Sequence, residues 1–183
     1  MTAMSTAITR QIVLDTETTG MSQATDRIVE VCAIEVDDDF NEIDSFHAFI
    51  NPQRKVPWFV TRIHGLNNEF LDDKPIFSDI GRDLLLFLEG SELWAHNMSF
   101  DAGMLNAEFA RNRLPTLEKV DCRLNCTLQL ARSTFPGQKN SLDALLDRFA
   151  IDRSERRLHG AMIDTRLLVK VYQNLVSYRT KTS

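Results

Sequence analysis

The chain has 183 residues, of which 43% are hydrophobic and 26% are charged. This length and apolar content are typical of one globular domain with a full core, and they exclude a disordered or fibrous protein. The formal net charge of −5 excludes binding of nucleic acid through overall positive charge. A polyanionic ligand would therefore need a local site.

The chain has few cysteines and no long apolar segment. Cys32, Cys122 and Cys126 are too few for a disulfide framework, and no second pair or nearby histidine completes a zinc site. We interpret all three as buried thiols of a cytoplasmic protein. The N-terminus lacks the apolar run of a signal peptide, and no stretch reaches the ~20 apolar residues that span a bilayer. We therefore expect no insertion into a membrane.

The first half of the chain is typical of strands. Residues 1–7 are small and polar, and we expect them to be disordered. Three segments rich in β-branched residues follow, at Ile8–Thr16, Arg27–Asp37 and Ile43–Ile50. The short links between them predict an antiparallel meander. The next segment, Asn51–Lys74, is irregular and carries one short predicted helix at Trp58–Ile63.

The second half alternates helical and strand-like patterns. Strands are predicted at Glu92–His96 and near Val120–Arg123. Helices are predicted from Ser78 to before Gly90, at Phe100–Arg113, up to about Thr134, from Ser141 to about Phe149, and at Ala161–Val176. Residues 177–183 are expected to be frayed. The whole chain, residues 1–183, is thus predicted to form one α/β domain with a mixed sheet and helices on its faces.

Two acidic residues close the first strand-like segment. Asp15 and Glu17 are two residues apart, so on an extended strand their side chains point to the same side. Two like charges about 4 Å apart repel by roughly 4 kcal/mol at an effective dielectric near 20, so the pair requires a cation or a proton. A solvated strand end is the alternative interpretation.

Two further acids lie on the apolar stripes of predicted helices. Asp101 shares a helix face with Leu105, and Asp164 shares one with Leu168. Each acid alone is compatible with a helix cap or with an arginine partner. Four acids that converge on one core from three elements indicate instead a site for divalent cations, and all-oxygen ligands favour Mg²⁺ or Mn²⁺ over zinc.

A histidine lies close to the last of these acids. His159 stands five residues before Asp164, and Gly160 is expected to let the chain turn so that the imidazole reaches the site from a loop. A histidine of near-neutral pKa beside an activated water is a suitable general base. For His47 and His96 we favour structural roles.

Three motifs, in this order, resemble those of a known family. They are DTETTG at 15–20, NMSFD at 97–101 and HGAMID at 159–164. Together they resemble the motifs of the DnaQ-like 3′–5′ exonucleases, in the DEDDh class, and most of all those of the proofreading (epsilon) subunits of bacterial DNA polymerase III. The segments IHGL at 63–66 and FPGQKNSLDALLDRF at 135–149 extend the resemblance over nearly the whole chain.

The resemblance implies an RNase H-like fold with a five-stranded mixed sheet. It also implies two divalent cations, Mg²⁺ or Mn²⁺, held directly by Asp15, Glu17 and Asp164, with Asp101 completing the site. His159 would take a proton from the attacking water, and nucleoside 5′-monophosphates would leave from the 3′ end of DNA.

The resemblance further implies a pocket for the terminal nucleotide. Its expected lining is the backbone around Thr18, the side chains of Met21, His64 and Phe100, and the carboxylates of Asp15, Glu17 and Asp164. Apolar side chains there would stack on bases without reading sequence, although core packing is the alternative for Met21 and Phe100.

Two positions depart from the family pattern. Phe59 stands five residues before His64, where related proofreading subunits often carry a glutamate. Substrate contacts in this segment are therefore expected to differ from those of the family. Cys32 stands where a glycine is common, and we assign it no function.

Partners and two other functions stay open. The resemblance implies a single-stranded or frayed 3′ end of DNA as substrate, with a DNA polymerase catalytic subunit and a small accessory subunit as partners. An exoribonuclease of the RNase T or oligoribonuclease type would use the same chemistry on RNA. An inactive binding module would keep the fold alone. The sequence leaves open whether the chain is free-standing or a catalytic domain of a longer subunit. We interpret the arginine-rich segment Arg148–Arg157 as a solvated face or a phosphate contact.

Overall fold

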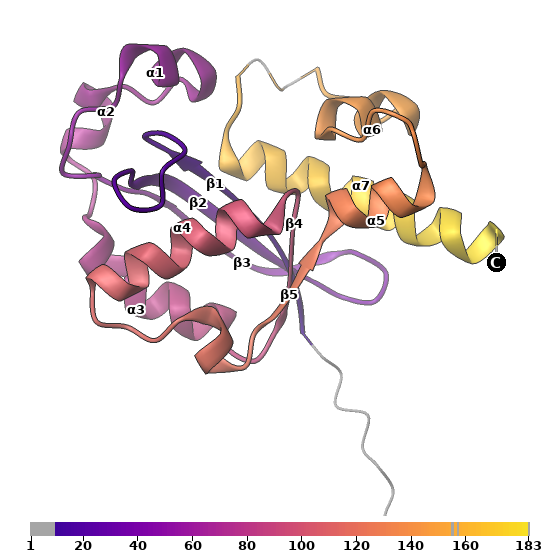
Figure 1. Cartoon of the computed structure of the whole chain (residues 1–183), viewed down its shortest axis with the longest axis horizontal. Coiled ribbons are helices and arrows are strands. Elements are labelled where there is room, and N and C mark those ends of the chain that lie inside the picture. Colours follow the sequence, from indigo (N-terminus) through magenta and orange to yellow (C-terminus); the bar gives the residue numbers. More distant parts are fainter. Residues whose placement is uncertain (1–9, 155, 157, 183) are drawn as a thin grey trace, which may run out of the picture.

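A single five-stranded sheet organises the protein. The computed structural model describes residues 10–154, 156 and 158–182 (Figure 1). Its strands lie in the order β3-β2-β1-β4-β5, with β2 antiparallel to both β1 and β3, and with β4 and β5 parallel to β1. They are β1 (Gln11–Thr18), β2 (Ile28–Val36), β3 (Glu42–Phe49), β4 (Glu92–Ala95) and β5 (Arg123–Cys126). The predicted meander and mixed sheet are both confirmed.

Helices flank this sheet in the part of the chain that the structure describes. They are α1 (Trp58–His64), α2 (Asn68–Asp72), α3 (Phe77–Leu88), α4 (Met98–Arg111), the 3-10 helix η1 (Leu117–Val120), α5 (Thr127–Thr134), α6 (Leu142–Arg148) and α7 (Ala161–Thr182). In Figure 1, α4 crosses in front of the strands with α3 beside it, and α5, α6 and α7 form a second group.

The alternation of side chains along the strands separates two cores. On β1, Ile12 and Leu14 pack with residues of α3 and α4, whereas Val13 packs with residues of α5, α6 and α7. On β2, Cys32 and Ile34 likewise pack with α7. Because successive residues of a strand point to opposite faces, Asp15 and Glu17 lie on the α7 side of the sheet.

Local sequence explains where several helices begin. The Ser141 hydroxyl accepts a hydrogen bond from the backbone of Ala144 at 3.3 Å, which confirms the predicted start of α6. Helix α3 begins at Phe77 rather than at Ser78, because Asp79 accepts from the backbone N–H of Ile76 at 3.1 Å. Helix α4 begins and ends two residues earlier than expected.

Strand β5 begins later in the chain than we expected. The segment expected as a strand at Val120–Arg123 is the end of η1 followed by β5, which begins at Arg123. Asp121 between them has a φ of 58°, a left-handed conformation that interrupts extended backbone. The short helix α2 was not expected at all, and the side chain of Asn67 caps it by accepting from Phe70.

The last helix is longer than expected. Helix α7 does not end at Val176 and leave 177–183 frayed, but continues to Thr182. Basic residues in its last turn favour this extension because they face the negative end of the helix dipole. The expected disorder of residues 1–7 and the expected strand start at Ile8 lie outside the described residues.

The three cysteines are free thiols, and Cys32 and Cys122 are buried as expected. The prediction was wrong for Cys126, which is only partly buried at the end of β5. Among the described residues, the helices are all too short or too polar to cross a membrane.

Candidate active site

The end of β1 brings two carboxylates to the α7 face of the sheet. Burial, with the charges of Asp101 and Glu17, raises the pKa of Asp15 well above its usual range. Burial, with the charges of Asp164 and Glu30, raises the pKa of Glu17 to about 8. These shifts arise because carboxylates crowd into a region of low dielectric. The predicted common face of Asp15 and Glu17 is therefore a site of unbalanced negative charge.

Helix α4 supplies a third acid from the other side of the sheet. Asp101 is only 3% exposed, and its Oδ1 accepts a hydrogen bond of 2.7 Å from the hydroxyl of Thr16. Burial raises the pKa of Asp101 to about 7, while the Thr16 hydroxyl lowers it by stabilising the ionised form. Thr16 lies between Asp15 and Glu17 on β1, so this bond fixes α4 to the strand that carries them.

Helix α7 supplies the fourth acid, and a residue of β2 positions that helix. Glu30 accepts from the backbone N–H of Ala161 at 3.0 Å and from His47 at 2.8 Å, so its charge faces the positive end of α7. Asp164 follows within the first turn, where it is 4% exposed. Register places Glu30 opposite Glu17, which locates Asp164 near the end of β1.

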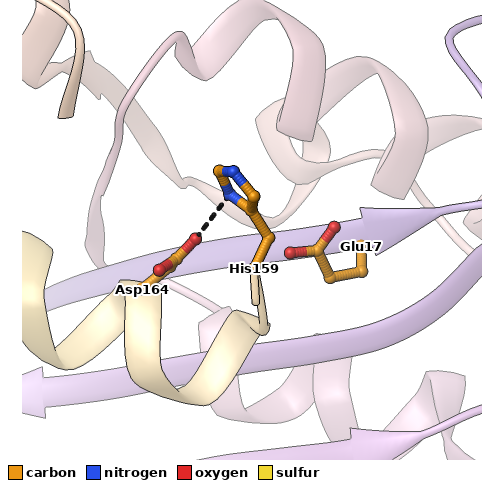
Figure 2. A group of neighbouring side chains, drawn as sticks. All are labelled: Glu17, His159 and Asp164. Carbon is orange, nitrogen blue, oxygen red and sulfur yellow. Dashed lines mark hydrogen bonds and ion pairs between the residues drawn. The ribbon is translucent and has the colours of Figure 1, made fainter. Parts of the chain in front are cut away.

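The loop before α7 presents the predicted general base. His159, Asp164 and Glu17 form a group whose nearest ligand atoms all lie within 4.8 Å of one another (Figure 2). Nδ1 of His159 is 3.1 Å from Oδ2 of Asp164, and the ring is partly exposed. Gly160 was expected to let the chain turn here, but it has no left-handed backbone, and a Cβ there would meet nothing closer than 3.9 Å, so this turn does not require a glycine.

The glycine that the site requires is instead Gly65, at the end of α1. It has a φ of 80° and closes the helix by donating to the carbonyl of Thr61. The carbonyl of Ile63, in the last turn of the same helix, accepts a hydrogen bond of 3.1 Å from the backbone N–H of His159. Helix α1 and the loop that carries His159 are therefore tied together.

An arginine that we had not assigned to the site lies inside it. Arg156 donates to both carboxylate oxygens of Asp164, through Nε to Oδ1 and through Nη2 to Oδ2 at 2.9 Å. Its Nη1 donates to Asp143 of α6, and Nη2 lies 2.8 Å from Nδ1 of His159. The arginine partner considered as the alternative role for Asp164 thus exists, but it stands among other acids rather than in place of them.

These residues fit a divalent cation. Burial raises the pKa values of Asp15, Glu17 and Asp101, and neighbouring carboxylates raise those of Asp15 and Glu17 further, so a bound cation would stabilise their ionised forms. Carboxylate oxygens are the ligands that Mg²⁺ and Mn²⁺ prefer. The imidazole of His159 lies close to two carboxylates of the site, those of Glu17 and Asp164.

The sequence matches the family described as "Exonuclease" over residues 12–172. The chain belongs to the exonuclease family. DNA polymerase III subunit epsilon of Salmonella typhimurium is 44% identical over 184 residues, which covers 97% of this chain and 75% of that protein. The subunit of the same name from Rickettsia conorii is 46% identical over 177 residues, covering 93% and 75%.

Solved exonucleases share the fold of this exonuclease domain. A structure of exonuclease X with 5′ overhanging duplex DNA has a TM-score of 0.68 and 26% identity, and covers 91% of both chains. E. coli exonuclease I with a dT13 oligonucleotide has a TM-score of 0.82 at 17% identity, over 95% of this chain and 42% of that one. The predicted family, the RNase H-like exonuclease fold and the 3′–5′ exonuclease activity are confirmed.

The residues expected to bind the terminal nucleotide differ in how far they are exposed to solvent in this exonuclease. Burial lowers the pKa of His64, and the main chain of Thr18 partly opposes this shift, so these two residues lie together. Met21 is 78% exposed and free to contact a ligand. Phe100 is half-buried against the core of α3 and α4, which agrees with its alternative role in packing. Cys32, on β2, is buried and lies opposite Asp15 of β1.

Sequence reasoning missed three residues that organise the exonuclease site. Arg156 was counted with an arginine-rich stretch, although its position three residues before His159 was a usable signal. Thr16 was visible inside the first motif, but its partner, Asp101, is 85 residues away. Glu30 stands in a strongly apolar strand, where an unpaired charge would be costly, and this pattern indicates a buried partner.

Proposed function

We propose that this exonuclease uses divalent cations, two of Mg²⁺ or Mn²⁺, to remove nucleotides from the 3′ end of DNA as 5′-monophosphates. The observation that supports this proposal best is the convergence of Asp15, Glu17, Asp101 and Asp164 from β1, α4 and α7, with His159 beside them. The relatives named DNA polymerase III subunit epsilon, and the exonucleases solved with DNA, favour DNA as the substrate.

The acids have separate positions and therefore separate roles. Asp15, Glu17 and Asp164 would hold the cations directly, because they share one face of the sheet. Asp101 would complete the site from α4, with Thr16 fixing one of its oxygens. Cations bound there supply an activated water and neutralise the 3′ oxygen that leaves. Thr18, Met21 and His64 would border the terminal nucleotide.

His159 would act as the base through its ring nitrogens. Nδ1 lies 2.8 Å from Nη2 of Arg156 and 3.1 Å from Oδ2 of Asp164. One imidazole nitrogen cannot accept from the arginine and donate to the carboxylate at once. When Arg156 withdraws and Nδ1 donates to Asp164, Nε2 keeps its lone pair and can take a proton from water.

The expected partners extend this proposal. The net charge of −5 gives the chain little general affinity for DNA, which suits a subunit to which a polymerase delivers the primer end. A polymerase catalytic subunit, a small accessory subunit and a cytoplasmic location remain proposals based on relatives of this chain.

Time-resolved product analysis tests the reaction. A 3′-mismatched primer-template and its RNA counterpart are incubated with Mg²⁺ or Mn²⁺ and the parent protein, Asp15→Ala or His159→Ala. We expect 5′-mononucleotides from DNA, and a loss of at least about 100-fold in each variant. Asp83→Ala, which removes an exposed carboxylate of α3, serves as the matched control. A preference for RNA would give the exoribonuclease, and inactivity on both substrates would give the binding module.

A further inference from the structure

Helix α1 turns an apolar face to solvent. Trp58 is 70% exposed, Phe59 is 56% exposed, and Ile63 at the other end of the helix is half exposed. The opposite face of the same helix is buried through Val60 and His64. Large apolar side chains gathered on one exposed helix face are typical of a binding surface, because exposing them to water is unfavourable.

The composition of this face suits single-stranded nucleic acid. The rings of Trp58 and Phe59 lie edge to face with centroids 6.0 Å apart, and the guanidinium of Arg62 lies 5.8 Å from the centre of the Trp58 ring. Exposed aromatic rings stack on bases, and an arginine beside them neutralises phosphate and stacks in turn. In a chain with a net charge of −5, such a local cation is the complement that a phosphate backbone needs.

The same helix adjoins the candidate active site. The hydrogen bond from His159 to the carbonyl of Ile63 joins the end of α1 to the catalytic loop. A mainly apolar cavity of about 410 Å³ also lies there, lined by His64, Leu158 and His159 among other residues. Trp58 is five residues from Ile63, or about 8 Å along the helix axis. The helix that carries the aromatic face therefore reaches the loop of His159 at its C-terminal end.

We propose that Trp58 and Phe59 form a stacking platform for bases upstream of the terminal nucleotide, with Arg62 on the adjoining phosphate. This inference rests on the proposed function, which places a 3′ strand at His159. Stacking tolerates any base, as an enzyme that degrades varied sequences requires.

Fluorescence measures binding to the platform without any reaction. The chain has two tryptophans, and Trp94 stacks on Tyr172 with ring centroids 4.2 Å apart. Its buried Nε1 has no hydrogen-bond partner among the described residues, so Trp94→Phe removes no bond and leaves Trp58 as the reporter. Single-stranded oligothymidylate is titrated into this protein in EDTA, and we expect saturable quenching of Trp58. Adding Phe59→Ala is expected to weaken binding roughly tenfold.

Kinetics separate the platform from the catalytic site. Trp58→Ala is expected to raise KM for a single-stranded DNA oligonucleotide roughly tenfold with little change in kcat. Hydrolysis of the p-nitrophenyl ester of thymidine 5′-monophosphate should not change, because this substrate has no upstream base. Leu86→Ala removes a side chain of α3 that is 57% exposed, and it should alter neither substrate.

The outcomes decide between distinct conclusions. Unchanged oligonucleotide binding in Phe59→Ala together with an unchanged KM in Trp58→Ala would overturn the platform. Equal losses on both substrates would also overturn it and would indicate a structural role for α1. If these variants bind DNA as the parent protein does but no longer bind a purified polymerase subunit, the platform is refuted and the aromatic face of α1 is a protein contact. Quenching that depends on Phe59, in a protein that hydrolyses neither substrate, would support the platform while refuting the proposed function.

Discussion

Arg156 holds Asp164 by both carboxylate oxygens at the point where a cation is expected to bind. Both side chains are less than one-tenth exposed, so the pair is buried. A buried carboxylate that loses its only cation is left with an uncompensated charge. Arg156 therefore acts as an internal counter-ion for the metal-free exonuclease.

Replacing Arg156 should expose this role. In Arg156→Gln, we expect the metal-free protein to lose about 3 kcal/mol of unfolding free energy, because Asp164 stays buried without its partner. Bound Mn²⁺ should restore most of this loss. The affinity for Mn²⁺ should rise about tenfold, because the cation no longer competes with the guanidinium. Urea unfolding with EDTA or Mn²⁺, together with calorimetric Mn²⁺ titration, measures both effects.

A neighbouring arginine provides the control. Arg153 pairs with Asp143 and Asp147 of α6, so Arg153→Gln removes a charge from the same loop without touching Asp164. It should leave Mn²⁺ affinity unchanged. Weaker Mn²⁺ binding in Arg156→Gln would contradict the competition and indicate that Arg156 only holds the loop in place.

The raised pKa values predict how stability depends on pH. Folding raises the pKa of Glu17 from 4.5 to about 8 and the pKa of Asp101 from 3.8 to about 7. Between these pH values the folded chain binds protons more tightly than the unfolded chain does. Stability of the metal-free protein should therefore fall as pH rises through these windows. Thermal unfolding in EDTA from pH 5 to pH 8.5 measures the slope. Glu17→Gln should flatten it, and a stability that rises with pH in the parent protein would be inconsistent with these shifts.

Divalent cations should reverse this dependence. They bind the ionised carboxylates, so the Mn²⁺-induced rise in Tm should grow as pH increases toward 8. The same thermal scans with excess Mn²⁺ measure this gain. A gain that does not vary with pH would mean that Glu17 and Asp101 are not coupled to the cations.

The hydroxyl of Thr16 should tune Asp101. Thr16→Val keeps the shape of the side chain but removes a buried hydrogen bond to a carboxylate, so the pKa of Asp101 should rise further. We expect kcat/KM at pH 7 to fall roughly tenfold, with partial recovery at higher pH. Thr16→Ser restores the hydroxyl and should restore activity. Equal losses in Val and Ser variants would assign Thr16 to packing alone.

Glu30 should position α7. Glu30→Gln weakens its bonds to the backbone of Ala161 and to His47, so we expect unfolding free energy to fall by about 1–2 kcal/mol. Activity should fall with it, because Asp164 lies in the first turn of α7. Chemical unfolding and product assays measure the two. Glu35→Gln, which breaks the pair with Arg10 on the same strand, should cost stability without a matching loss of activity.

Much of the fold could be predicted because it depends on local periodicity. Segments rich in β-branched residues predicted β1 and β2, and a spacing of two put Asp15 and Glu17 on one face. The failures occurred where one residue changes the backbone. Asp121 adopts a left-handed φ and delays β5, and Asp79 rather than Ser78 sets the start of α3. Such effects depend on single side-chain contacts that a repeating pattern does not contain.

The sequence by itself determined the family and the sheet and singled out the acids and histidine of the candidate site, because these follow from short motifs and their spacing. Only the tertiary structure decided which groups surround them. Thr16 meets Asp101 across 85 positions and Glu30 meets Ala161 across 131, and the sheet creates both contacts. Arg156 reaches Asp164 because the loop folds back on α7. A charge selects its partner by distance in space, which only the packed chain defines.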